Sequence, residues 1–64
     1  MRHLEINFKK LANSEVEVCF DIMEYSKTIE DCWKELERYK ETERITVLQY
    51  NEIKSAVTFE VVED

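Results

Sequence analysis

Glycine and proline are both absent from this 64-residue chain, and their absence limits what the chain can fold into. Average usage would give roughly four or five glycines and about three prolines in this length. Loops that cradle phosphate groups need backbone conformations and close approaches that a Cβ atom forbids. The sequence therefore excludes nucleotide-binding loops of the P-loop and dinucleotide-binding kinds.

The length predicts a single domain, residues 1–64, with a small core. A chain this short buries only about 60% of the surface that its unfolded form exposes. An apolar content of 44% with seven aromatic residues still favours folding, although 38% of the residues are charged. We expect marginal stability, which favours a dimer or a partner.

The acidic residues outnumber the basic ones 15 to 9, which gives a net charge of −6. This balance disfavours direct binding to nucleic acid or to an anionic membrane and favours a basic protein surface as partner. No apolar run approaches the ~18–20 residues of a membrane span, and the charged start "MRHLEINFKK" does not resemble a signal peptide. With only two cysteines, the sequence predicts a cytoplasmic protein with free thiols.

Two segments near the start alternate between apolar and polar residues, as half-buried strands do. They are "HLEINFKK", with Leu4, Ile6 and Phe8 facing inward, and "EVEVCFDI", with Val16, Val18, Phe20 and Ile22 facing inward. The intervening "LANSE" is predicted as a turn, with Asn13 in a left-handed conformation. Either Lys9 faces Glu17 across this hairpin or Asn7 faces Asp21, and the second register avoids a pair of like charges.

The segment "YSKTIEDCWKELERYKETER" predicts a helix. Its apolar residues recur at helical spacing and form one stripe, made of Ile29, Cys32, Trp33, Leu36 and Tyr39. Thr28 followed by Asp31 resembles a capping box at its start, and Ser26 is the competing cap. Trp33 lies at the edge of this stripe and is either a core residue or a half-exposed anchor, and the core is favoured.

Two further strands are predicted in "RITVLQY" and "SAVTFEVVE", joined by a turn at "NEIK" with Asn51 as the turn residue. The second of them has a clear inward face of Val57, Phe59 and Val61. The first has apolar residues on both faces, so its inward face is left open.

These elements predict a two-layer α+β domain of the order ββαββ, with one helix across one face of a four-stranded mixed sheet. A right-handed crossover gives the strand order 2-1-4-3, with the first and last strands parallel in the centre. This element order resembles the β-grasp topology over the whole chain. The resemblance implies uses as varied as protein modifiers, ferredoxins and binding modules. Two-iron ferredoxins need four cysteine ligands and the chain has two, so the expectation is a binding module without a cofactor.

No catalytic or metal site is predicted. Cys19 faces outward on the predicted sheet and Cys32 inward, so no disulfide is expected, and the neighbouring acids Glu17 and Asp21 oppose a reactive thiolate. His3 is the only histidine; it is too far from Cys19 for a dyad and has only Glu5 beside it as a second metal ligand. The sequence therefore predicts a protein that is not an enzyme.

The leading functional hypothesis is an acidic interaction module that binds a basic site of a partner protein, one that normally holds nucleic acid, and inhibits by occupancy. Alternate carboxylates along a strand stand ~6.6 Å apart and can imitate a phosphate backbone. In its brevity, acidity and lack of motifs the chain resembles small phage-encoded inhibitors of host nucleases, anti-CRISPR proteins among them. The alternative is a structural homodimer that assembles through a sheet edge or the outer sheet face. The predicted partner-binding residues are the acids Glu15, Glu17, Asp21, Glu5 and Glu60 with the apolar Leu48, Tyr50 and Val62.

Overall fold

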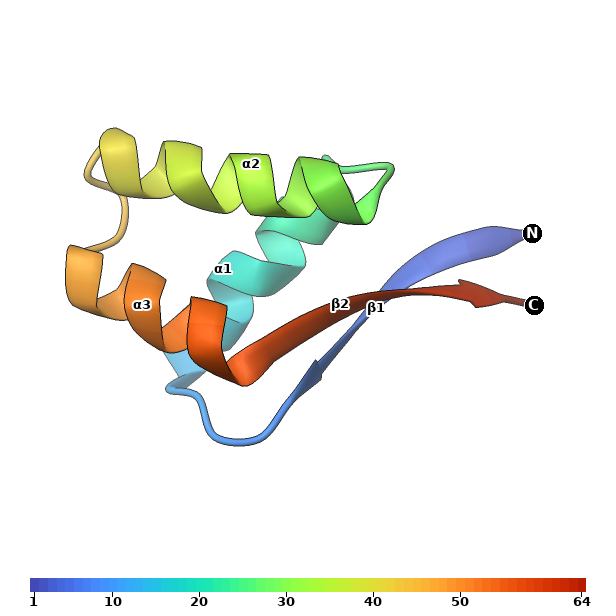
Figure 1. Cartoon of the computed structure of the whole chain (residues 1–64), viewed down its shortest axis with the longest axis horizontal. Helices are drawn as coiled ribbons and strands as arrows, with labels where there is room; N and C mark the ends of the chain where they lie inside the picture. The colour runs from blue at the N-terminus through green and yellow to red at the C-terminus, as the bar shows by residue number, and fades with distance from the viewer.

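The computed structural model of the protein describes all 64 residues and contains three helices and two strands (Figure 1). In chain order these are β1 (Arg2–Phe8), α1 (Asn13–Glu24), α2 (Ile29–Glu41), α3 (Val47–Ala56) and β2 (Val57–Glu63). The strands form a two-stranded antiparallel sheet, here called the β-ribbon. The protein is a small α+β domain, and the predicted β-grasp-like arrangement of one helix across a four-stranded sheet is wrong.

The β-ribbon joins the first and last segments of the chain along their whole lengths. Its register runs from Arg2 opposite Glu63 to Phe8 opposite Val57. Sequence patterning placed these two segments side by side but parallel, whereas the pairing is antiparallel. The predicted alternation is confirmed in the middle of the ribbon, where Leu4 and Ile6 are half-buried and Val57 and Phe59 are buried. Phe8 and Val61, which were also predicted to face inward, are exposed.

Helix α1 occupies the segment that was predicted as the second strand. Its buried residues are Glu15, Cys19 and Ile22, which follow the i, i+4, i+7 spacing of one helix face. The alternation that suggested a strand would have buried Phe20, which is 54% exposed. The segment fits both the two-residue alternation of a strand and the 3.6-residue repeat of a helix. The helix forms because it places both Cys19 and Ile22 in the core.

Helix α3 replaces the predicted third strand and the turn after it. Thr46 caps it: the Thr46 side chain accepts a hydrogen bond from the Gln49 N–H at 3.1 Å, and the Gln49 side chain accepts one from the Thr46 N–H at 2.9 Å. This reciprocal pair is a capping box, which satisfies two of the free donors at a helix start. Ile53 then becomes the residue by which the helix enters the core.

The predicted turn residues do not form turns. Asn13 is the first residue of α1, and Asn51 lies inside α3. The left-handed conformation falls instead on Glu43, with φ of 61°, in the connection between α2 and α3. A non-glycine residue there carries a steric cost, which a chain without glycine has to accept somewhere.

Helix α2 agrees with its prediction. The Thr28 side chain accepts a hydrogen bond from the Asp31 N–H at 3.1 Å, and Leu36 is fully buried. Trp33 is half-buried at the edge of the core and makes an edge-to-face contact with Phe59, with ring centroids 4.9 Å apart.

Nine buried apolar residues form the core between the three helices and the inner face of the ribbon. Cys19 and Cys32 both belong to it and are free thiols. The prediction is confirmed for the burial of Cys32 and wrong for Cys19, because α1 is a helix that turns Cys19 inward.

The β-ribbon extends beyond the helices, and both chain ends lie side by side at its projecting tip (Figure 1). The Asp64 N–H donates a hydrogen bond to the Met1 carbonyl oxygen at 2.9 Å there. The three helices gather at the other end of the ribbon, so one half of the ribbon is covered and the other half projects.

Candidate functional site

A groove lies beneath the projecting end of the ribbon, between β1 and the connection from α1 to α2. Its volume is about 870 Å³, within the usual range for binding sites, and we call it the tip groove. Its lining residues are Arg2, His3, Leu4, Phe20, Met23, Glu24, Ser26, Lys27, Thr28, Ile29, Glu30 and Val61.

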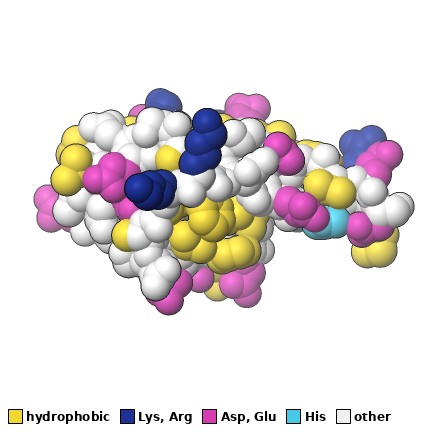
Figure 2. Space-filling view, turned by 90° about the horizontal axis from the view of Figure 1, so that it is seen from below, with side chains coloured by type: hydrophobic (Ala, Val, Ile, Leu, Met, Phe, Trp, Pro, Cys, Tyr) yellow, Lys and Arg dark blue, Asp and Glu magenta, His cyan; other side chains and the backbone are white.

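The floor of the tip groove is apolar. The ribbon contributes Leu4 and Val61, and the helices contribute Phe20, Met23 and Ile29. Phe20 is 54% exposed and Val61 is 46% exposed. A contiguous group of large apolar side chains in contact with water is typical of an interaction surface. Figure 2, a view from below, shows the ribbon with its acidic side chains projecting to one side of the helices.

The rim of the tip groove carries charges of both signs. Arg2 pairs with Glu63 across the ribbon at 3.0 Å, and both side chains are well exposed. Glu24 at the end of α1 and Lys27 in the α1–α2 connection also line the groove, and no ion pair joins them. Exposed pairs of this kind contribute little stability, so these groups can bind a partner at small cost to the fold.

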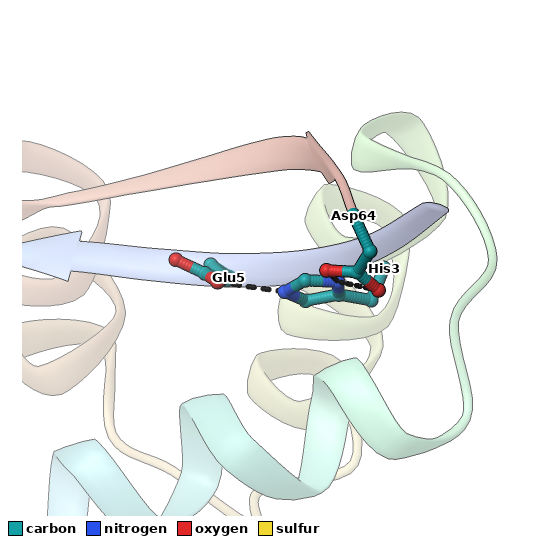
Figure 3. A network of polar contacts seen from close by, with 3 residues as sticks. All are labelled: His3, Glu5 and Asp64. Carbon is teal, nitrogen blue, oxygen red and sulfur yellow. Dashed lines mark hydrogen bonds and ion pairs between the residues drawn. The ribbon is translucent and has the colours of Figure 1, made fainter. Parts of the chain in front are cut away.

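His3 connects the two strands at the ribbon tip (Figure 3). Its Nε2 lies 2.6 Å from a carboxylate oxygen of Glu5, and its Nδ1 lies 3.1 Å from one of Asp64. A carboxylate can only accept, so both contacts are hydrogen bonds only when both ring nitrogens carry protons. The hydrogen bond to Glu5 is the main cause that raises the pKa of His3, and Asp64 raises it further against the opposing effect of desolvation. The contacts therefore favour the charged imidazolium.

Two acids face each other on the outer side of the ribbon. Glu5 and Glu60 are direct partners in the register. The next pair on the same face of the ribbon is His3 with Val62. Both Glu5 and Glu60 are exposed, as the sequence predicted. Three of the predicted partner-binding residues, Glu5, Glu60 and Val62, thus share one face of the ribbon.

Glu15 does not lie on an outer surface. It is only 3% exposed, in the first turn of α1, where one carboxylate oxygen accepts a hydrogen bond from the Ala12 N–H at 3.1 Å. The other oxygen, Oε2, is buried without a hydrogen-bond partner. The predicted row of carboxylates on a strand is therefore wrong, since its first member is buried and the segment is a helix.

Glu52 of α3 lies beside Glu15, and the two carboxyl groups interact. The hydrogen bond to Glu15 and then the charge of Glu15 raise the pKa of Glu52. Two ionised carboxylates can only accept, so a hydrogen bond between these groups requires a proton on one of them. Glu15 Oε2 is the buried acceptor that lacks a partner.

The two thiols of the core are unsuited to nucleophilic chemistry. Burial, followed by the charge of Glu15 and the presence of Cys32, raises the pKa of Cys19 to about 11. Burial also raises the pKa of Cys32. A thiol acts as a nucleophile through its thiolate, which these environments disfavour.

The remaining predicted residues are not brought together. Glu17 and Asp21 are exposed on α1, one turn apart. Leu48 is 68% exposed on α3, at the end of the molecule away from the ribbon tip (Figure 1). Tyr50 is half-buried on the same helix, with the Lys40 Nζ 4.3 Å from its ring centroid. The predicted apolar patch of Leu48 and Tyr50 with Val62 does not form, because Val62 lies on the ribbon.

No group of three or more histidine, cysteine or acidic side chains is arranged to hold a metal ion. In the His3 network the two carboxylates occupy different ring nitrogens rather than converging on one point. None of the three helices combines the length and the apolar character that crossing a bilayer requires.

Sequence reasoning missed the apolar floor of the tip groove. Phe20 was assigned to the inward face by strand parity, and a helical reading of α1 would have placed it outside the buried stripe of Cys19 and Ile22. The contribution of Asp64 to the His3 network depends on pairing between the two ends of the chain. No local signal in the sequence indicates that pairing.

No protein-family model matches the sequence, and no curated protein or solved structure matches the chain either.

Proposed function

We propose that the protein is a small, non-enzymatic interaction module that binds a basic surface of another protein. The observation that carries this proposal is the tip groove, an apolar floor exposed beneath a projecting ribbon whose charged residues are mostly acidic. Interfaces commonly combine an apolar centre with a charged rim.

Charge supports the choice of partner. Arg2 is the only basic residue among β1, β2 and Asp64, apart from His3, and it stands against four acids. These acids are Glu5, Glu60, Glu63 and Asp64, so the ribbon has a formal charge of +1 − 4 = −3 within a chain of −6. Such a field attracts a basic partner and repels nucleic acid and anionic membranes.

The partner class that fits this field is a nucleic-acid-binding protein, whose basic site the ribbon would occupy. Occupancy of that site would make the protein an inhibitor, as proposed from its acidity. A cytoplasmic location belongs to the same proposal, since both thiols are free and disulfides are rare in that compartment. No cofactor is required.

Affinity capture with matched variants tests the proposal. The tagged full chain is incubated with lysate of its native host, next to Val61→Asp in the tip groove and Val47→Asp on α3, where Val47 is 63% exposed. We expect a basic protein that the parent and Val47→Asp retain, that Val61→Asp loses, and that salt releases. The captured protein is then purified and the binding measured directly. Equal retention by Val61→Asp, or a captured partner with an acidic surface, contradicts the proposal.

Self-association through the sheet is the second candidate, favoured by the two unpaired edges of a two-stranded sheet. Sedimentation at tens of micromolar distinguishes it. A stable dimer that Val61→Asp or an edge variant dissolves supports self-association, and a monomer excludes it at that concentration.

A further inference from the structure

Strand β1 offers unpaired backbone groups along one edge. The hydrogen bond from the Asp64 N–H to the Met1 carbonyl makes these two residues a hydrogen-bonded pair of the antiparallel ladder. Such pairs alternate along a ladder, so the odd-numbered residues of β1 direct their N–H and C=O groups toward β2. The even-numbered residues direct theirs to the open edge. They are Arg2, Leu4, Ile6 and Phe8.

The backbone groups on this edge have no hydrogen-bond partner within the protein. No backbone hydrogen bond outside the helices and the ribbon involves residues 2–8, and no side chain donates to or accepts from their backbone. An edge strand with free donors and acceptors is a template for a further strand.

The tip groove runs along this edge of β1. Three consecutive residues, Arg2, His3 and Leu4, line the groove, whereas β2 contributes Val61 alone. Consecutive residues of a strand point to opposite faces, so a groove that reaches all three follows the strand's edge. The free backbone groups of Arg2 and Leu4 therefore border the groove.

We propose that an extended segment of the partner enters the tip groove and adds to the β1 edge as a third strand, with apolar and basic side chains in alternation. This inference rests on the proposed function and specifies its binding mode. Strand addition takes its affinity from main-chain hydrogen bonds and its specificity from alternate side-chain positions.

The two faces of the ribbon determine which side chains fit at the alternate positions of the added strand. Inward side chains of the added strand meet the apolar floor made by Leu4, Phe20 and Ile29. Outward side chains lie beside Glu5, which faces Glu60. A lysine or arginine there is attracted by two carboxylates that have no basic partner other than His3.

A second copy of this chain fits the edge less well. Pairing two β1 edges brings together two ribbons whose formal charge is −3 each, and Arg2 is the only basic residue, apart from His3, that the added strand contributes. The negative field of the ribbon attracts a basic segment and repels a second copy of this chain.

A display library of random peptides of about ten residues, long enough to form a strand, tests the proposal on the full-length protein. We expect the enriched peptides to alternate apolar and basic residues, and their affinity to fall about tenfold or more with Val61→Asp and to stay unchanged with Val47→Asp. Enrichment of peptides with apolar residues at helical spacing, or of none above the Val61→Asp background, overturns the proposal. Phe20→Asp serves as a second groove variant if Val61→Asp fails to fold.

Backbone N-methylation of the best peptide gives the decisive comparison, because it removes one hydrogen-bond donor and leaves the side chains in place. Methylation of the amides on one edge of the peptide should weaken binding about tenfold or more, and methylation of the other edge should not. In the complex, hydrogen exchange of the Arg2, Leu4 and Ile6 amides should slow, whereas the His3 and Glu5 amides are already protected by β2.

These outcomes separate the binding mode from the function. Equal tolerance of methylation on both edges, without new protection at Leu4, overturns strand addition even where capture of a basic partner by the groove still holds. Loss of groove-dependent capture overturns the proposed function itself. A dimer in sedimentation whose formation protects the Leu4 amide assigns the edge to a second copy and overturns the proposal for a partner segment.

Discussion

Glu5 and Glu60 face each other directly across the β-ribbon, two carboxylates at one position of an otherwise complementary pairing. Like charges at facing positions of an antiparallel pair destabilise it. The protein accepts this cost on the outer face, beside the edge to which we assign a basic partner. The pair thus links the stability of the ribbon to its proposed binding.

Removal of one of the two charges should separate these effects. Glu60→Gln should raise the free energy of unfolding by about 0.2–1 kcal/mol at neutral pH, since it relieves the repulsion from Glu5. The same change should weaken binding of a basic partner. Urea unfolding measures the first effect, and Glu41→Gln, at an exposed position of α2, is the matched control. A destabilised Glu60→Gln variant would show that the pair is not repulsive.

The His3 contacts predict a pH dependence of the ribbon tip. Because Glu5 and Asp64 raise the pKa of His3 above 6.5, its contribution to stability is complete below pH 6.5 and is lost as the pH rises through the raised value. The melting temperature of the parent should therefore fall relative to that of His3→Gln as the pH rises from about 6 to about 8. An NMR titration of the imidazole measures the pKa itself. A midpoint at or below 6.5 contradicts the contacts of Figure 3.

The Glu15–Glu52 pair predicts a pH dependence of the same direction as that of His3, in a more acidic range. The pKa of Glu52 is raised above 4.5, so the pair stabilises the fold below that pH and loses this effect as the pH rises through the raised value. Glu52→Gln keeps a donor for Glu15 at every pH and should raise the melting temperature at pH 7. Glu37→Gln on α2 removes one exposed charge and controls for the change in net charge. Equal effects of the two substitutions would indicate that Glu15 and Glu52 do not share a proton.

Cys19 should behave as an inert core residue. With a pKa of about 11, on the order of one thiol in a thousand is ionised at pH 8, and the side chain is fully buried. A thiol reagent should therefore modify the native protein far more slowly than the protein in urea. Fast labelling of one thiol in the native protein, located at Cys19 by mass spectrometry, would contradict the burial.

The elements that sequence patterning predicted correctly are those in which a single period fits. In α2 the apolar residues and the Thr28 cap agree, and in the two outer segments only the alternation of a strand fits. Helix α1 satisfies two periods at once, and its valines favoured the strand. The helix prevails because three helices bury Cys19 and Ile22, a tertiary effect that no local pattern contains.

In the candidate site, too, only the features that depend on a local sequence pattern could be predicted. The outward orientation of Glu5 and Glu60 could be predicted, because it depends only on alternation along each strand. The tip groove could not, since it requires residues 2–8 to pair with residues 57–63 from the other end of the chain. The burial of Glu15 likewise depends on the helical conformation of α1.

Helix α3 did carry a local signal, and its cap can be tested. Thr46 and Gln49 have the spacing of a capping box, and each side chain accepts a hydrogen bond from the other residue's N–H. Thr46→Ala removes the side-chain acceptor and should lower the free energy of unfolding by about 1 kcal/mol. Thr58→Ala, at an exposed position of the ribbon, is the matched control, although loss of threonine from a strand has a small cost of its own. If the segment were a strand, as its sequence pattern suggested, Thr46→Ala would have no larger effect than Thr58→Ala in urea unfolding.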